Sequence, residues 1–368
     1  MKTSLFDYHL PENLIANSPI SPRDHSKLMV VNRKTGKIEH KHFFDIADLL
    51  TKNDVLVLNK TKVFPARIYG KKDTGGKVEI LLNKNTDNYS WEALSKPGLN
   101  VGTKVNFDGF RAEVIGRDSE IHNFKFNLSK GKLLESLQTV GVTPLPPYIH
   151  STEKEEDIRK EYQTTYAKDL GSVAAPTAGF HFTKELLKKL IDKGIQIEYV
   201  TLHVGLGTFA PIKTETLEDH NMHSEFFFVE KETIERLNKA KELGKRIISV
   251  GTTSTRVLES LANDDSRLDT SNLDASTNIF IYPPYKFKFV DALITNFHLP
   301  KSTLLALIST FVSFPNTKKK FVNFKKSLSG KAYDEAIKSN YRFYSFGDSM
   351  FITTNHLHKL LERLSAWA

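Results

Sequence analysis

Histidines beside glycine-rich or small-residue runs are the residues of this sequence best suited to chemistry. They are His181 in PTAGFHFT, His203 in TLHVGLGTF, His298 in TNFHLPKST, and the pair His220 and His223 in EDHNMHSEF. A neutral imidazole titrates near physiological pH and can therefore accept or release a proton. In an α/β sheet, such runs at strand ends meet in one crevice. We therefore expect these segments to form one site, although a structural role explains any single histidine equally well.

A run of hydroxyl side chains adds binding groups to this set. GTTSTR, residues 251–256, follows the strand-like run RIISV and reads as the start of a helix. The amides at a helix N-terminus, with the hydroxyls of Thr252, Thr253 and Ser254, are placed to bind an adenosine-like or anionic group. An ordinary threonine-rich helix start is the structural alternative.

The glycine-rich run GLGTFA, residues 205–210, resembles the dinucleotide-binding fingerprint. Pro211 follows it, and no helix opens where that fingerprint needs one. We interpret the run as a turn at which Gly205, Gly207 and Thr208 bring backbone close to a ligand. No P-loop or GxSxG motif occurs, so neither a P-loop nucleotidase nor a serine hydrolase has support.

A metal centre is the alternative for the histidine cluster, because His220, His223 and Glu225 have zinc-binding side chains that His181 or His203 could complete. The HExxH order is missing, however, and polar contacts to a substrate fit the pattern better. The chain has 0 Cys, which excludes disulfides, cysteine nucleophiles, thiolate zinc sites and iron–sulfur clusters. We predict a site without metal or cofactor.

The charge of the chain favours an anionic partner. Lys+Arg is 52 and Asp+Glu is 43, which gives a net charge of +9, although a lysine-rich composition alone would give the same number. Cations among aromatic residues suit phosphates and unpaired bases. The predicted RNA-binding residues are Arg67, Arg256, Lys286, Lys288, Lys301 and Arg342.

Two alternating patterns set the expected fold. Short β-rich runs between about residues 63 and 128 indicate a small barrel or sandwich. Elsewhere strands such as 195–204, 246–251 and NIFIY alternate with helices such as 153–168, 302–314 and one near 357–364. We predict a three-layer α/β/α domain with a mostly parallel sheet, formed by residues 1–60 and 145–368, and an inserted β-barrel domain at 61–144. The lysine-rich segment 317–329 is expected to be a mobile loop.

The N-terminus lacks the unbroken apolar core of a signal peptide, and the longest apolar stretch, LLALISTFVSF, is far too short for a membrane span of about 18 residues. We expect a soluble, cytoplasmic protein.

Long ordered motifs in this sequence resemble those of the S-adenosylmethionine:tRNA ribosyltransferase-isomerases of queuosine biosynthesis. They include SPRDHSKLMVV, LNKTKVFPARIYG, YQTTYAKDLGSVAAPTAGFHFT, VTLHVGLGTFAPIK, GTTSTRVLES, VDALITNFHLPKSTLLALIS and YRFYSFGDSMFI. The matching runs extend from residue 6 to 352. The resemblance implies an α/β domain with an inserted barrel, which agrees with the pattern of elements.

The resemblance also implies an activity. The family transfers the ribosyl part of S-adenosylmethionine, a co-substrate here, onto 7-aminomethyl-7-deazaguanine at the tRNA wobble position. It yields epoxyqueuosine and releases adenine and methionine. On this basis His181, His203, His298 and Glu225 are the candidates for proton transfer and orientation, without an order among them. The hydroxyls of 252–254 and the glycine turn would bind S-adenosylmethionine, and a monomer would bind the tRNA anticodon arm.

The chain departs from the family pattern at three positions. Lys60 follows Asn59 where many members have an acidic or amide residue, Pro284 replaces a usual glycine, and Phe346 replaces a common tyrosine. Segment 317–329 looks like an insertion that aids tRNA binding. An RNA methyltransferase, a non-catalytic RNA-binding protein and a metal hydrolase stay open as alternatives.

Overall fold

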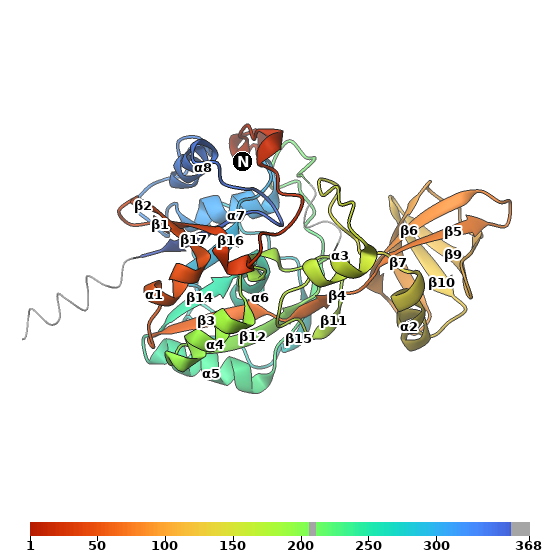
Figure 1. The fold of residues 1–368 in the computed structure, drawn as a ribbon, viewed down its shortest axis with the longest axis horizontal. Helices are drawn as coiled ribbons and strands as arrows, with labels where there is room; N and C mark the ends of the chain where they lie inside the picture. Colours follow the sequence, from red (N-terminus) through yellow and green to blue (C-terminus); the bar gives the residue numbers. More distant parts are fainter. Residues whose placement is uncertain (206–210, 355–368) are drawn as a thin grey trace, which may run out of the picture.

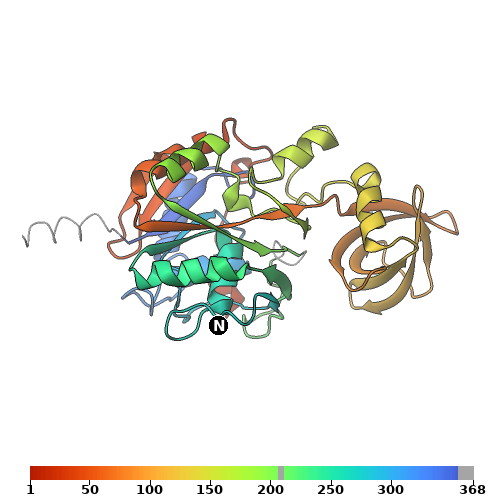
Figure 2. The same ribbon diagram turned by 90° about the horizontal axis from the view of Figure 1, so that it is seen from below.

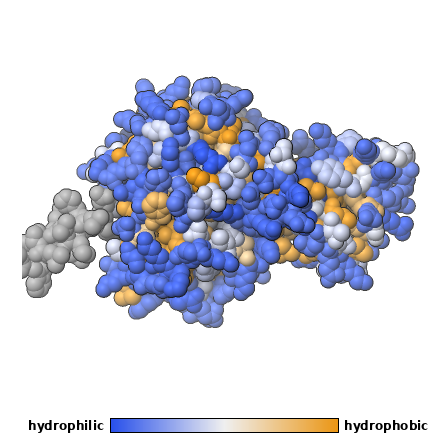
Figure 3. All heavy atoms as spheres, in the orientation of Figure 1, coloured by the Kyte–Doolittle hydropathy of each residue, from blue (hydrophilic) through white to orange (hydrophobic). Residues whose placement is uncertain are grey.

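The protein is elongated and consists of an α/β domain with a small barrel projecting from it (Figure 1). This computed structural model describes residues 1–205 and 211–354. Hydrophilic residues cover most of the face seen in Figure 3 on both domains. In the part of the chain that is described, no helix is long and apolar enough to cross a bilayer.

Among the described residues, nine strands form the sheet of the α/β domain. Their order is β15 (Asp274–Thr277), β13 (Glu225–Phe228), β12 (Gln196–Leu202), β3 (Asp54–Asn59), β14 (Arg246–Val250), β16 (Ala292–Asn296), β17 (Ser349–Thr353), β1 (Lys27–Asn32) and β2 (Ile38–His42). The four strands β12, β3, β14 and β16 are mutually parallel. The β12–β13, β13–β15, β16–β17 and β1–β2 pairs are antiparallel. β1 and β17 also pair in parallel, so half of the strand pairs are parallel and the sheet is mixed rather than mostly parallel.

Helices cover both faces of this sheet. The described helices are α1 (Ile46–Leu49), α2 (Lys130–Val140), α3 (Glu155–Glu161), α4 (Lys184–Asp192), α5 (Lys231–Glu242), α6 (Gly251–Leu261), α7 (Thr303–Phe311) and α8 (Leu328–Lys338). In β3, Val55 and Val57 pack with α5 to α8, whereas Leu56 and Leu58 pack with α1 and α4. Because alternate side chains of the buried strand face opposite sides, helices pack on both faces and form the three layers seen edge-on in Figure 2. The predicted α/β/α class is confirmed.

The inserted domain is a closed antiparallel barrel of six strands within the described chain. Its strands run around the barrel as β10 (Ile121–Phe126), β7 (Ser90–Lys96), β6 (Lys77–Asn85), β5 (Arg67–Lys72), β8 (Lys104–Asn106) and β9 (Arg111–Asp118). Side chains fill the interior, and Leu133 and Leu137 of α2 close one opening. The barrel interior is thus a packed core rather than a ligand cavity.

A short two-stranded ribbon joins the domains. β4 (Thr61–Val63) leads into the barrel and pairs with β11 (Asp169–Ser172), outside both larger sheets. Gln163 bonds both backbone groups of Val63 with its side chain, which extends this ribbon. Because Gln163 is used in this way and Tyr162 is buried, α3 ends at Glu161 and the helix expected over 153–168 is shorter.

Three further expectations have different outcomes. NIFIY, residues 278–282, is not a strand, because β15 ends just before it at Thr277. The carbonyls of Thr277 and Ile279 accept hydrogen bonds from the Arg256 guanidinium. Segment 317–329 is anchored rather than loose, because Phe324 is 1 % exposed and α8 begins at Leu328. The helix expected near 357–364 lies outside the described residues.

Candidate active site

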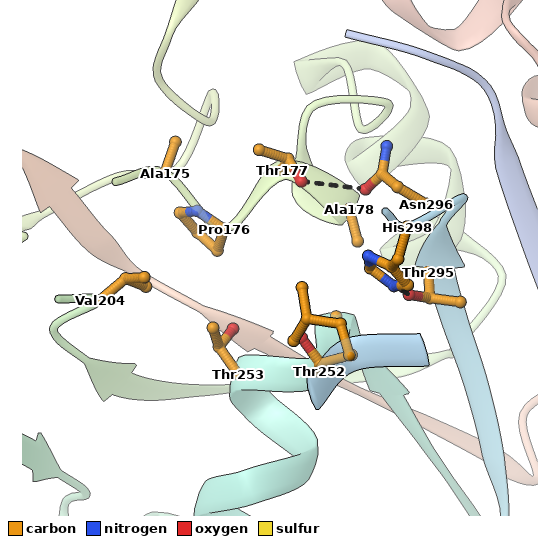
Figure 4. A pocket seen from close by; sticks show the side chains of 12 residues that line it. Ala175, Pro176, Thr177, Ala178, Val204, Thr252, Thr253, Thr295, Asn296 and His298 are labelled. Atoms are coloured by element: carbon orange, nitrogen blue, oxygen red, sulfur yellow. Dashed lines mark hydrogen bonds between the residues drawn. The ribbon is translucent and has the colours of Figure 1, made fainter. Parts of the chain in front are cut away.

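A pocket opens at the carboxyl edge of the parallel strands. Residues 251–253 follow β14, residues 295–298 end β16, Val204 follows β12, and residues 175–178 follow β11. About 360 Å³ of space lies between them, part of it open to solvent. Figure 4 shows Thr177, Thr252, Thr253, Asn296 and His298 around this space. Ligands of α/β proteins bind at this edge of the sheet, so the pocket is the candidate active site.

The N-terminus of α6 forms one wall. Gly251 has φ +85°, a backbone conformation that favours glycine, and no side chain caps the helix. The hydroxyls of Thr253 and Ser254 are buried without a hydrogen-bond partner among the described residues, as is that of Thr303 at the start of α7. Buried hydroxyls are normally satisfied. Of these residues Thr253 lines the pocket, and its hydroxyl, together with the free amides of the first turn, points to a ligand that accepts hydrogen bonds here.

His298 projects into the pocket from the end of β16 (Figure 4). Its Nε2 lies 2.8 Å from Thr295 Oγ1, which leaves Nδ1 for a ligand when Nε2 carries the proton. Tyr8 donates to the His298 carbonyl at 2.5 Å, and the His298 amide donates to the Tyr333 hydroxyl at 2.8 Å. Burial lowers the pKa of His298 to about 3, so the ring is neutral at physiological pH.

His181 lies behind Asn296 rather than in this pocket. Its Nδ1 is 2.7 Å from Ser26 Oγ, and its Nε2 is 3.5 Å from the Asn296 amide nitrogen. That nitrogen also donates to the Tyr344 carbonyl, which fixes the orientation of the amide, while Asn296 Oδ1 accepts from Thr177. Burial, and then the charges of Arg23 and Arg342, lower the pKa of His181 to about 3. Asn296 therefore connects His181 to the wall of the pocket.

The two depressed histidine pKa values predict acid sensitivity. Below pH 6.5 the unfolded chain binds protons at His181 and His298 that the folded protein does not, so stability is lost as the pH falls from 6.5 towards 3. In that window each histidine lowers the free energy of unfolding by about 1.4 kcal/mol for each unit that the pH falls. We expect urea unfolding to show a loss of roughly 2–3 kcal/mol from these two residues between pH 6.5 and pH 5.5. A doubly substituted His181→Gln, His298→Gln protein should have a flatter pH slope, and an unchanged slope would contradict this assignment.

His203 sits at the junction with the barrel, not in the pocket. Its Nδ1 is 2.8 Å from Thr61 Oγ1 in β4, and its ring stacks on Phe226. A Cβ at residue 171 would lie 2.6 Å from His203 Nε2, so Gly171 makes room for the ring. Burial lowers the pKa of His203 despite the charge of Asp169. Lys60 forms ion pairs with the same Asp169 and with Glu230, and thus carries a buried cation into this junction.

Glu225 and Arg256 form a buried ion pair beside the pocket. Their side chains are 2 % and 3 % exposed. Glu225 Oε1 also accepts from the Gly205 amide at 2.8 Å, and so holds the start of the glycine-rich turn. Arg256 was predicted to bind RNA, but its guanidinium is enclosed by Glu225 and the carbonyls of Thr277 and Ile279. In this structure it supports the site from behind instead of presenting a surface to RNA.

The other predicted RNA-binding residues are dispersed. Arg67 pairs with Glu79 on the barrel, and Lys301 pairs with Asp7 near the pocket edge of the sheet. Arg342 lies near His181. The Lys288 amide donates to Glu259 at the far end of α6, so Lys286 and Lys288 lie towards the opposite edge of the sheet from the pocket. Only Lys301 and Arg342 come near the candidate site from the α/β domain.

Gly207 and Thr208 lie outside the described residues. Sequence reasoning missed Thr177, Thr295 and Asn296, which contact the pocket. The last two end an apolar strand and lie three and two residues before His298, so their position was the available signal. No group of three or more His, Cys, Asp or Glu suited to a metal occurs within the described ranges.

The fold and the pocket are those of an α/β protein with a polar pocket at the carboxyl edge of its sheet. The sequence matches the family described as queuosine biosynthesis protein over residues 3–352. The crystal structure of an S-adenosylmethionine tRNA ribosyltransferase from Thermotoga maritima is similar, with 36% sequence identity over 95% of this chain and 99% of that chain, and a TM-score of 0.52. The chain belongs to the queuosine biosynthesis protein family, and it is a transferase. The resemblance inferred from the motifs is thereby confirmed.

Proposed function

We propose that this enzyme transfers and isomerises the ribosyl part of S-adenosylmethionine onto 7-aminomethyl-7-deazaguanine at the wobble position of tRNA, giving epoxyqueuosine with release of adenine and methionine. The pocket supports this proposal because it combines uncapped helix amides, unpartnered hydroxyls and a neutral histidine. These groups suit an adenosine moiety and a proton transfer. The similarity to the Thermotoga maritima enzyme supports both substrates.

The proposed chemistry uses groups that the pocket contains. The sulfonium of S-adenosylmethionine acidifies the adjacent ribose carbon, so a neutral base can remove a proton from it. His298 is assigned this role because its ring lines the pocket and its Nε2 faces Thr295, which leaves Nδ1 for the substrate. Hydrogen bonds from the hydroxyls and amides at the start of α6 would ease the departure of adenine. The tRNA amine then attacks, and displacement of methionine closes the epoxide, without a cofactor or a metal in the scheme.

The pocket and the basic residues near it define the proposed partners. Lys301 and Arg342 lie on the side of the α/β domain that carries the pocket, and Arg67 lies where the barrel begins. We assign Lys301 and Arg67 to the anticodon arm and Arg342 to an anionic group of either substrate, with the arm bound by a monomer acting in the cytoplasm. Three lysines of segment 317–329, Lys318 to Lys320, are exposed, but the segment's Phe321 stacks on Phe6. Its part in tRNA binding is therefore tested by reversing these charges, not by deleting the segment.

Thr253→Val is expected to change binding and stability in opposite directions. Valine removes a buried hydroxyl without a partner, so the free energy of unfolding should rise by about 1 kcal/mol. The same change should weaken S-adenosylmethionine binding about tenfold, because the ligand loses a hydrogen bond. Calorimetric titration and urea unfolding measure the two effects. Thr255→Val is the matched control: Thr255 bonds Ser249 and the Gly251 carbonyl, so its loss should destabilise the protein.

The products of S-adenosylmethionine consumption test the proposed function. With tRNA carrying the precursor base, we expect free adenine and methionine in equal amounts. S-adenosylhomocysteine would indicate a methyltransferase instead. Binding of tRNA without consumption of S-adenosylmethionine would indicate a non-catalytic RNA-binding protein, and loss of activity with a chelator would indicate a metal hydrolase.

A further inference from the structure

A second pocket lies on the other side of His181 from the candidate active site. It is bounded by Arg23 and Ser26 near the N-terminus, by Phe180 and His181, and by residues 345–347. About 220 Å³ of space lies within it, part of it open to solvent. No acidic residue lines it. The scheme proposed above uses none of these residues for binding, so the pocket has no assigned occupant.

Arg23 brings a cation to this pocket whose hydrogen bonds go to backbone carbonyls, with Glu161 as the nearby carboxylate. Its guanidinium donates to the carbonyls of Gln163 and Glu161, both at 2.6 Å, and to that of Lys160 at 3.3 Å. These bonds use both terminal nitrogens, and two of the five N–H groups of an arginine stay available. The structure records no ion pair for Arg23 within the described residues, and burial lowers its pKa. A half-buried arginine of this kind is suited to an oxyanion.

Arg342 adds a second positive charge next to the same pocket. Its guanidinium donates to the Ser18 carbonyl, and its charge, like that of Arg23, acts on the buried ring of His181. Arg342 likewise forms no recorded ion pair in the described chain, although its backbone amide donates to Asp348. The neutral ring of His181 does not offset either cation. Glu161 and Asp348 act on these two cations, but neither carboxylate lines the pocket, so the lining itself carries positive charge.

Aromatic walls strengthen the attraction of these cations for an anion. Phe180 and Phe346 stack with ring centroids 5.7 Å apart, and Arg23 lies over Phe180 at 5.2 Å. Both rings are buried. Apolar walls lower the local dielectric, so attraction between a cation and a bound anion is larger here than at an open surface. Phe346, where related sequences commonly have tyrosine, adds to this apolar character.

We propose that this second pocket binds an oxyanion of a substrate, a carboxylate or a phosphate, with Arg23 and Arg342 as its cations. The proposal rests on the proposed function, which supplies two sources of such a group: the carboxylate of the methionine part of S-adenosylmethionine, or a phosphate of the anticodon loop. The contacts from Ser26 through His181 and Asn296 to Thr177 join the two pockets. An anion held here would place its substrate next to the reacting groups.

Binding of S-adenosylmethionine, its decarboxylated analogue and tRNA should be measured separately for the wild type, Arg342→Ala, Arg23→Lys and Arg267→Ala. Arg267 is a surface arginine paired with Glu242 and serves as the control. If the anion is the carboxylate, the wild type should prefer S-adenosylmethionine over the analogue about tenfold, and Arg342→Ala should lose that preference. Arg23→Lys should lose part of it, because lysine cannot reproduce the paired hydrogen bonds.

If the anion is a phosphate, Arg342→Ala should instead weaken tRNA binding and lower its salt slope by about 0.7–0.9. Thermal unfolding first shows that Arg342→Ala and Arg23→Lys are folded. The proposal is overturned if these variants match Arg267→Ala both in the preference for S-adenosylmethionine over its analogue and in tRNA binding. Should the wild type bind neither substrate, the proposed function fails by itself. Inorganic phosphate then probes the pocket directly. Phosphate binding by the wild type that is lost in Arg342→Ala supports the proposal. Equal binding by the two proteins, or no binding by the wild type, overturns it.

Discussion

His298→Ala is expected to lower the turnover number by about 10²- to 10⁴-fold, the usual contribution of a general base. Of the predicted catalytic residues, His298 alone lines the candidate active site. Two tyrosines hold its backbone and Thr295 holds its ring, so its position is fixed before any substrate binds. Single-turnover measurement with saturating substrates gives this rate. Thr295→Val should lower the turnover number about tenfold, because the His298 ring keeps its place but loses the hydrogen bond that fixes its orientation.

The comparison with a distant histidine makes this prediction specific. His40 lies on the edge strand β2, contacts Tyr341 and Glu335, and is half-exposed. His40→Ala should therefore turn over at the wild-type rate. Wild-type turnover in His298→Ala would remove His298 from the mechanism, and a larger loss in His181→Ala or His203→Ala would transfer the role to that residue.

Arg256→Ala is expected to reduce the free energy of unfolding by about 3–5 kcal/mol, because it leaves the carboxylate of Glu225 buried without its partner. Urea unfolding measures this loss. Glu225→Gln combined with Arg256→Met should recover part of it, since neither side chain then carries a buried charge. The same carboxylate accepts from the Gly205 amide, so S-adenosylmethionine binding should weaken along with stability.

The surface arginine Arg267 again provides the matched control, with its side chain 58 % exposed. Its replacement by alanine should change stability by no more than about 0.5 kcal/mol. If Arg256→Ala kept wild-type stability and lost only tRNA affinity, Arg256 would be an RNA contact, as the sequence suggested, and its role as an internal support would be wrong.

Local sequence patterns were sufficient for much of the fold. The continuous apolar runs of β3 and β14 are typical of strands buried on both faces, and both lie in the centre of the sheet. Short strands with turn residues indicated a barrel or a sandwich. The choice between them depends on the β5–β8 and β7–β10 pairings, which join strands distant in sequence and which no local pattern specifies.

Charge misled the sequence interpretation where the deciding partner is distant. Arg256 follows threonines at a helix start and reads as an exposed cation, but Glu225 lies 31 residues earlier and pairs with it. In segment 317–329 the lysines suggested a loose loop, whereas Phe324 packs against both Tyr8 and Tyr333. Similarly, His298 lines the pocket, but Asn296 separates His181 from it and His203 lies at the barrel junction, and no spacing shows that.

Mass analysis of the wobble nucleoside tests the central claim most directly. tRNA carrying 7-aminomethyl-7-deazaguanine is incubated with S-adenosylmethionine and the enzyme, digested to nucleosides and analysed against a reaction with His298→Ala. We expect the wild type to convert the wobble nucleoside to epoxyqueuosine, with ribose carbons labelled when the S-adenosylmethionine is labelled there, and His298→Ala to leave it unchanged. An unmodified wobble nucleoside, or one that gains only a methyl group, from the wild-type reaction would contradict the account.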